Sequence, residues 1–176
     1  ASMKGLLTVL LGRTRRNHAL EHATMHLLSR SHSSPRLVGR SDWRGFWLYG
    51  NVSTLLVLAD TTQALSRLKG HESQLAIHPR CGTRLTMTFL SAGTLAYAAW
   101  SLPTRSRWTR GLAVAMSVLG ALFFSRPLGD WAQRKLTTCV DLENSWVSSI
   151  KRMRRSSPGS GNETNGLVVH RVLMAH

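Results

Sequence analysis

Residues 17–28 read NHALEHATMHLL, and the interpretation of the whole chain starts from this stretch. It places His18, His22 and His26 at successive steps of four residues. On an α-helix, such steps stack side chains one turn apart on the same face. The residues between the histidines are good helix formers, so we expect a helix here. Its buried side should carry Leu20, Leu27 and Leu28. Because two imidazoles one turn apart can reach the same ion, the stretch is a candidate metal site.

The order of the residues in this helix matches a known motif. His18, Glu21 and His22 form the pattern H-x-x-E-H. This pattern resembles the inverted zinc motif of the insulinase-type metallopeptidases. The resemblance implies that His18 and His22 hold zinc and that Glu21 is the catalytic base, which deprotonates a zinc-bound water. His26 extends the stripe by one turn and is a candidate cofactor-binding residue. The alternative is the polar face of a surface helix, with the histidines as bystanders.

A small sheet and a second helix are expected to follow the histidine helix. Residues 37–39 and 46–52 predict a β-hairpin, because bulky and β-branched residues flank a polar turn. Residues 55–69 have apolar residues at helical spacing, with a serine or threonine before them to cap the helix and Gly70 to end it. Residues 74–78 are expected to form a short strand. The fold class is therefore α+β, with helices on one face of a small antiparallel sheet.

The third zinc ligand is less clear from the sequence. In the insulinase-type family it is a glutamate on a later helix, but residues 55–69 contain no glutamate. Glu72, just past that helix, is the nearest equivalent. The choice stays open among Glu72, His71, His78 and Cys81, and we take Glu72 and His78 as the predicted further ligands.

Residues 78–83, HPRCGT, are the second informative stretch. A histidine at a strand end, followed by proline and a Cys-Gly turn, lies where site residues are often held. The alternative is a strand terminus that enters a membrane. Together with residues 15–24, RRNHALEHAT, and the apolar runs that follow, this stretch resembles an uncharacterised family of small bacterial membrane proteins. That resemblance covers most of the chain and implies no established activity.

Two apolar runs predict a transmembrane helical hairpin. Residues 85–102 carry no charge and are long enough to span a bilayer. Residues 111–125 form a shorter run that interfacial anchors can support, and three arginines lie in or beside the loop between the runs. The flanks hold the larger share of positive charge, so both termini are expected in the cytoplasm of a bacterium, with the hairpin in its inner membrane. A buried hairpin in a soluble protein is the alternative.

The net charge of the chain also fits a membrane environment. The chain of 176 residues has 23 basic and 8 acidic residues, a net charge of +15. Such an excess suits anionic lipid headgroups or nucleic acid. The apolar runs favour lipid, and no nucleic-acid-binding module is recognisable, so no nucleic-acid partner is expected. The two cysteines, Cys81 and Cys139, are expected to be free thiols.

The expected domains follow from these segments. Residues 3–83 with about 137–155 should form a soluble α+β metal-binding domain, residues 84–128 the transmembrane hairpin, and residues 156–176 a flexible basic and polar tail. Within that tail, residues 167–174 could add a late strand. Residues 3–11 are expected to be a short separate helix, on the membrane surface or packed on the domain. Arg13, Arg15 and Arg16 would then sit at the positive end of the histidine helix, where cations are unfavourable.

The predicted function is that of a membrane-anchored zinc-dependent hydrolase, and the expected class is a metallopeptidase acting on a peptide substrate. The alternative is a non-catalytic membrane subunit that binds haem, pigment or metal through the histidine stripe, or a structural component of a membrane complex. A homo-oligomer or a larger membrane complex is a further possibility for its partners. Whether the chain is an enzyme stays open at this level.

Overall fold

A computed structural model describes residues 3–31, 37–78, 81–103, 106–155 and 167–176. The chain divides into two compact units. The first unit comprises residues 1–78 and 138–176, and the second comprises residues 79–137.

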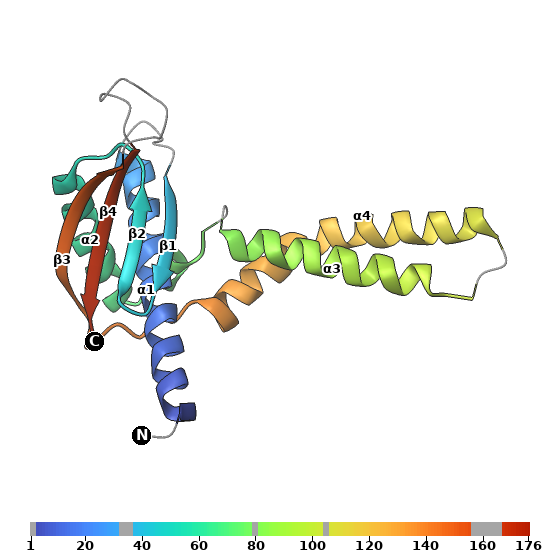
Figure 1. Cartoon of the computed structure of the whole chain (residues 1–176), viewed down its shortest axis with the longest axis horizontal. Helices are drawn as coiled ribbons and strands as arrows, with labels where there is room; N and C mark the ends of the chain where they lie inside the picture. Colours follow the sequence, from blue (N-terminus) through green and yellow to red (C-terminus); the bar gives the residue numbers. More distant parts are fainter. Residues whose placement is uncertain (1–2, 32–36, 79–80, 104–105, 156–166) are drawn as a thin grey trace. The chain divides into compact units, whose positions relative to one another are not determined.

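The first unit is built on a four-stranded antiparallel sheet (Figure 1). The strands are β1 (Val38–Asp42), β2 (Gly45–Tyr49), β3 (Trp146–Arg155) and β4 (Leu167–Ala175). Their order across the sheet is β1-β2-β4-β3, so the last strand in the chain lies between β2 and β3. The first two strands form the expected hairpin, although its turn is shorter than predicted and β2 ends at Tyr49.

Two helices cover one face of this sheet, which confirms the α+β prediction. Helix α1 (Met3–Ser31) packs against β1 and β2, and α2 (Thr54–Lys69) packs against α1 and β3. Both lie behind the sheet in the view of Figure 1. The core between the layers includes Leu20, Leu28, Phe46, Leu48 and Val172, all fully buried. Burial of Leu20, Leu27 and Leu28 was expected from the helical pattern and is confirmed.

The N-terminal helix differs from the prediction. Residues 3–11 are not a separate helix but the first turns of α1, which runs for 29 residues. Arg15 and Arg16 therefore lie inside the helix, and the expected conflict with its positive end does not arise. The Arg15 guanidinium donates to the carbonyl of Thr138, at 3.2 Å. Arg16 forms a 3.2 Å ion pair with Asp141.

The segment after α2 is also different. Helix α2 begins and ends as expected: the Ser53 hydroxyl accepts a bond from the Leu56 N–H, and Gly70 ends the helix. Residues 74–78 were predicted as a strand, and this was wrong. The chain instead forms the 3₁₀ turn η1 (Ser73–Ala76), with Leu75 and Ala76 buried against the core. This turn packs against α1.

The C-terminal segment is a structural strand. Residues 156–176 were predicted as a flexible tail, but β4 pairs with two strands and occupies the interior of the sheet. Val168, Val169 and Val172 are buried, which supplies the reason. Successive side chains of a strand point to opposite faces, so a segment that is buried at neighbouring positions belongs in the interior of a sheet. The late strand suggested by residues 167–174 is thereby confirmed. Residues 156–166 lie outside the described residues.

The second unit contains two long helices that pack against each other, α3 (Gly82–Trp100) and α4 (Arg107–Ala132). The hairpin was expected to end near residue 128. Helix α4 instead continues past Pro127 and leads into a π-helical turn, η2 (Gln133–Thr137). Among the described residues, one helix, Arg107–Thr137, is long and apolar enough to cross a membrane. A helical pair is therefore present, while a membrane span for α3 stays a prediction.

Candidate metal centre

Four histidines of the first unit lie together. Three of them, His18, His22 and His26, stand one turn apart on α1, and His78 follows η1. The ring centroids of His18 and His22 are 4.2 Å apart. The ring of His78 lies 5.6 Å from His22 and 4.9 Å from His26. The helical stripe seen in the sequence is thus joined by a residue more than fifty positions away.

Backbone carbonyls fix two of these rings. His22 Nδ1 is 2.7 Å from the carbonyl oxygen of Ala76, and His26 Nε2 is 2.7 Å from that of Ile77. A carbonyl oxygen can only accept, so each of these nitrogens carries the hydrogen. In the neutral rings, the lone pair is then on His22 Nε2 and on His26 Nδ1. Metal-binding histidines are usually oriented by a bond of this kind from the other ring nitrogen.

The 3₁₀ turn explains why these carbonyls are available. In a strand, the carbonyls of Ala76 and Ile77 would alternate in direction and serve a neighbouring strand. In η1 and the residue that caps it, both face helix α1 and accept from its histidines. Burial of Leu75 and Ala76 anchors the turn against that helix. The mispredicted element is therefore the one that orients the candidate ligands.

The donor atoms suit a metal ion. The ligand atoms of His18 and His22 lie within 4.8 Å of each other, and His22 is buried. Two nitrogens bound to the same tetrahedral zinc ion at about 2.0–2.1 Å lie roughly 3.3 Å apart, a separation within the 4.8 Å limit for these atoms. Cys81 follows His78 by three residues in the sequence, and thiolate is a common companion of imidazole on zinc. These histidines, with a cysteine near in sequence, could hold a metal ion.

Glu21 lies on the sheet side of α1. Its carboxylate is buried and accepts a short hydrogen bond from the Ser41 hydroxyl of β1. Gly39 leaves room for it, because a Cβ at that position would overlap the carboxylate. Burial raises the pKa of Glu21, while the Ser41 hydroxyl and the nearby His18 act in the opposite direction. The H-x-x-E-H glutamate is therefore held by the sheet beside the histidines.

Glu72 is not brought to the histidines. Its carboxylate is exposed and accepts two bonds from the Arg67 guanidinium, at 2.8 and 2.5 Å. These bonds lower the pKa of Glu72. His71, an alternative third ligand, is exposed and has a left-handed backbone with φ of 66°. Of the candidate third ligands within the first unit, His78 is the one that the fold places against the stripe.

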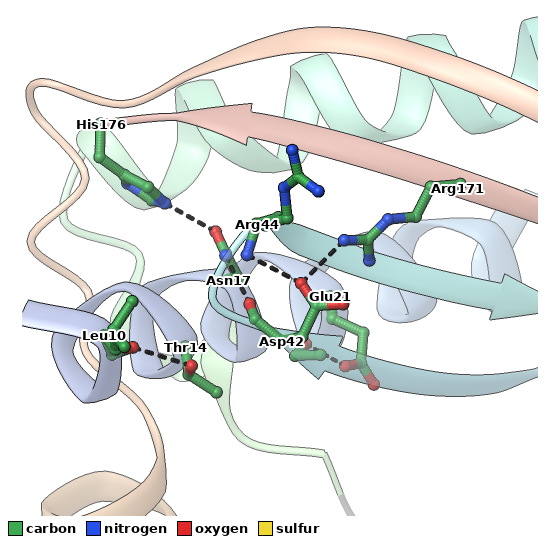
Figure 2. A network of polar contacts seen from close by, with 9 residues as sticks. Leu10, Thr14, Asn17, Glu21, Asp42, Arg44, Arg171 and His176 are labelled. Carbon is green, nitrogen blue, oxygen red and sulfur yellow. Dashed lines mark hydrogen bonds and ion pairs between the residues drawn. The ribbon is translucent and has the colours of Figure 1, made fainter. Parts of the chain in front are cut away.

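A polar network next to the site was not foreseen (Figure 2). The buried Asn17 amide donates to the carbonyl of Asp42 at 2.8 Å and accepts from His176 Nε2 at 3.0 Å. The Asp42 carboxylate accepts from the Arg171 guanidinium and from the Arg44 N–H, each at 2.8 Å. The sequence gives no sign of a role for His176, and only the position of β4 in the middle of the sheet reveals it.

The fold and the histidine cluster define an α+β protein with an attached pair of apolar helices. The chain belongs to the family defined by a domain of unknown function, DUF6391, whose model matches residues 13–150. It is similar to an uncharacterised protein of Picosynechococcus sp., with 32% identity over 161 residues, covering 86% of this chain and 76% of that protein. No solved structure matches. The expected kinship with an uncharacterised bacterial family is confirmed, while the peptidase resemblance depends on residues 18–22 alone.

Proposed function

We propose that this chain is a membrane-associated zinc protein in which His18 and His22 hold the ion. The orientation of His22 carries the proposal: Nδ1–H donates to Ala76, so the Nε2 lone pair remains for a metal. His78 and Cys81 are the residues that would complete the ligand set, since one lies against the stripe and the other follows it closely in sequence. Glu72 has no part in it.

The membrane part of the proposal is based on the second unit. Helix α4 has the length and composition of a bilayer span, and its large apolar side chains are mostly exposed. A water-soluble protein rarely exposes this much apolar surface. With a net charge of +15, the chain would favour anionic headgroups, and the inner membrane of a bacterium with cytoplasmic termini is the location we propose.

We further propose a hydrolytic role, with a peptide as the substrate class. A bound zinc ion would supply Lewis-acid polarisation of the reacting carbonyl. Glu21 is the residue that would accept and hold a proton, because it lies three residues from His18 and adjacent to His22. Its burial next to the histidines supports this role.

A second candidate function is a non-catalytic subunit that holds the metal, or a haem, as part of a membrane complex. The bond from Ser41 to Glu21 favours this candidate, because it ties the carboxylate to the sheet and leaves it less free to serve a substrate. Whether the chain forms a homo-oligomer within such a complex is part of the same proposal.

Metal analysis of the purified full-length protein tests the central part. We expect about one zinc per chain, lost in His18→Ala and His22→Ala and kept in His71→Ala, a control that removes an exposed histidine outside the cluster. Zinc retained in His22→Ala would refute the site, and a Soret absorption band would indicate haem instead. Glu21→Gln should keep the zinc. Loss of peptide hydrolysis in this variant supports the enzyme, and unchanged hydrolysis rejects Glu21 as its base.

A further inference from the structure

The first turns of α1 form an N-terminal arm, residues 3–12, that is separate from the packed part of the helix. Burial begins at Asn17, whereas residues 3–9 are all exposed. A Cβ added at Gly5 or at Gly12 would meet no atom within 4 Å beyond the neighbouring backbone of its own helix. The arm nevertheless continues the helix without a break.

Apolar side chains surround this arm. The relative exposures are 78% for Met3, 56% for Leu6, 54% for Leu7, 51% for Val9 and 63% for Leu11. An exposed helix that buries no face is ordinarily polar, and one that is apolar on most sides needs an apolar environment. These turns are therefore unsuited to water, and the first unit leaves them uncovered.

The charges around the arm identify the kind of surface that it fits. No acidic residue occurs before Glu21, while Lys4 lies in the arm and Arg13 follows it directly. An apolar helical segment flanked by basic residues suits the boundary between acyl chains and anionic headgroups. A second copy of the chain fits less well, because it would bring the same positive charges face to face on a protein of net charge +15.

We propose that the N-terminal arm lies in the surface of an anionic phospholipid bilayer, as a membrane contact of the first unit. The ten helical residues of the arm extend about 15 Å, half of the hydrocarbon core of about 30 Å, which is enough to embed in one leaflet. This contact is independent of the proposed metal site and of any span by α4.

The test uses the full chain in lipid nanodiscs, with an environment-sensitive fluorescent amino acid in place of Leu7. The matched control carries the same residue in place of Leu58, an exposed leucine of α2. In nanodiscs that contain phosphatidylglycerol, we expect blue-shifted emission at position 7, quenched by brominated acyl chains, and neither effect at position 58. If the emission at position 7 has the wavelength of the fluorophore in water and is not quenched by brominated acyl chains, the proposal is overturned.

Charge removal supplies the second measurement. Each basic residue near an anionic surface contributes roughly a fivefold change in the binding equilibrium, so Lys4→Gln with Arg13→Gln should weaken insertion roughly thirtyfold. Lys69→Gln with Arg40→Gln, an equal loss of charge elsewhere in the first unit, should leave the emission unchanged. If both pairs of substitutions change the emission equally, specific recognition of the lipid by the arm is overturned. A blue shift without lipid quenching, growing with protein concentration, assigns the arm to a second copy and also overturns the proposal.

Discussion

At the scale of single residues, a histidine binds a metal through the ring nitrogen that carries no hydrogen. The bond to the other nitrogen therefore decides which way the ring presents its lone pair. In this protein, consecutive carbonyls hold two histidines of one helix in opposite tautomers, Nδ1–H in His22 and Nε2–H in His26. Neighbouring rings thus differ in the nitrogen that they offer.

The sequence predicts part of this arrangement. Spacing alone places His18, His22 and His26 on one helical face, and the structure brings these rings together with His78. The tautomers could not be predicted, because the carbonyls that fix them belong to residues about fifty positions away. The sequence also could not show that His78, rather than Glu72, lies with the other histidines, because this depends on an ion pair between Glu72 and Arg67.

The titration of His176 leads to a pH prediction. Burial, aided by the charges of Arg13 and Arg16, lowers the pKa of His176 below 6.5. The folded protein therefore favours the neutral ring, and its contribution to stability is complete above pH 6.5 and is lost as the pH falls below that value. The ring also accepts from the Ser145 hydroxyl at 2.9 Å, which suits the neutral form.

We therefore expect His176→Gln to reduce the loss of thermal stability between about pH 7 and pH 5. Glutamine can still donate to Asn17 but does not titrate. The measurement is the melting temperature of both proteins across this range. Part of the slope should remain in the variant, because burial and the charge of Arg152 also lower the pKa of His170. Parallel curves for the two proteins would contradict the assigned role of His176.

At the scale of elements, α1 combines three tasks that the sequence seemed to separate. Its first turns form the exposed arm, its middle carries the histidines and Glu21, and its buried side fills the core. From the sequence, residues 3–11 were expected to form a short separate helix, with the arginines at the start of the next one. The helix instead runs through them, and Arg15 and Arg16 find partners at residues 138–141, a long-range contact that no local pattern reveals.

The short element after α2 was misread for a similar reason. Leu75 and Ile77 alternate with other residues as they would in a strand, but the sheet is completed by β3 and β4 from the far end of the chain. Residues 74–78 therefore have no neighbouring strand, and the 3₁₀ turn satisfies their carbonyls through the histidines of α1. Local alternation predicts a strand only where a partner strand is available.

The N-cap of α2 offers a prediction for this element. The Ser53 hydroxyl accepts from the Leu56 N–H at 3.3 Å, so Ser53→Ala should cost about 1 kcal/mol of stability. The measurement is the melting temperature of the purified protein. Ser66→Ala, an exposed position inside the same helix, is the control and should be neutral or slightly stabilising. An equal response of both variants would contradict the cap.

At the scale of the whole molecule, hydrophobic periodicity and run length predicted the α+β class and an apolar helix long enough to cross a membrane. The lipid surroundings that the basic excess suggests stay a prediction. The place of the C-terminal strand could not be predicted, because residues 167–176 follow a polar, glycine-rich stretch that suggests a tail. Only the pairing of β4 with β2 and β3 reveals that this segment completes the sheet.

Membrane insertion of α4 can be tested with one charge. Leu119 lies in the middle of the apolar run, and its side chain is exposed. Arginine at the centre of a spanning helix costs about 2.5–3.5 kcal/mol, so Leu119→Arg should shift the protein out of the carbonate-resistant membrane fraction. Leu55→Arg, at an exposed site on α2, is the control and should remain in that fraction. Identical fractionation of the two variants would count against a span by α4.

The central claim is that the histidines of α1 bind a metal through nitrogens that the fold has already oriented. X-ray absorption at the zinc K edge of the purified full-length protein tests it most directly. We expect a shell of nitrogen at about 2.0–2.1 Å with the scattering pattern of imidazole, and its loss in His22→Ala. An oxygen-only shell, or an imidazole shell that survives in His22→Ala, would contradict the claim.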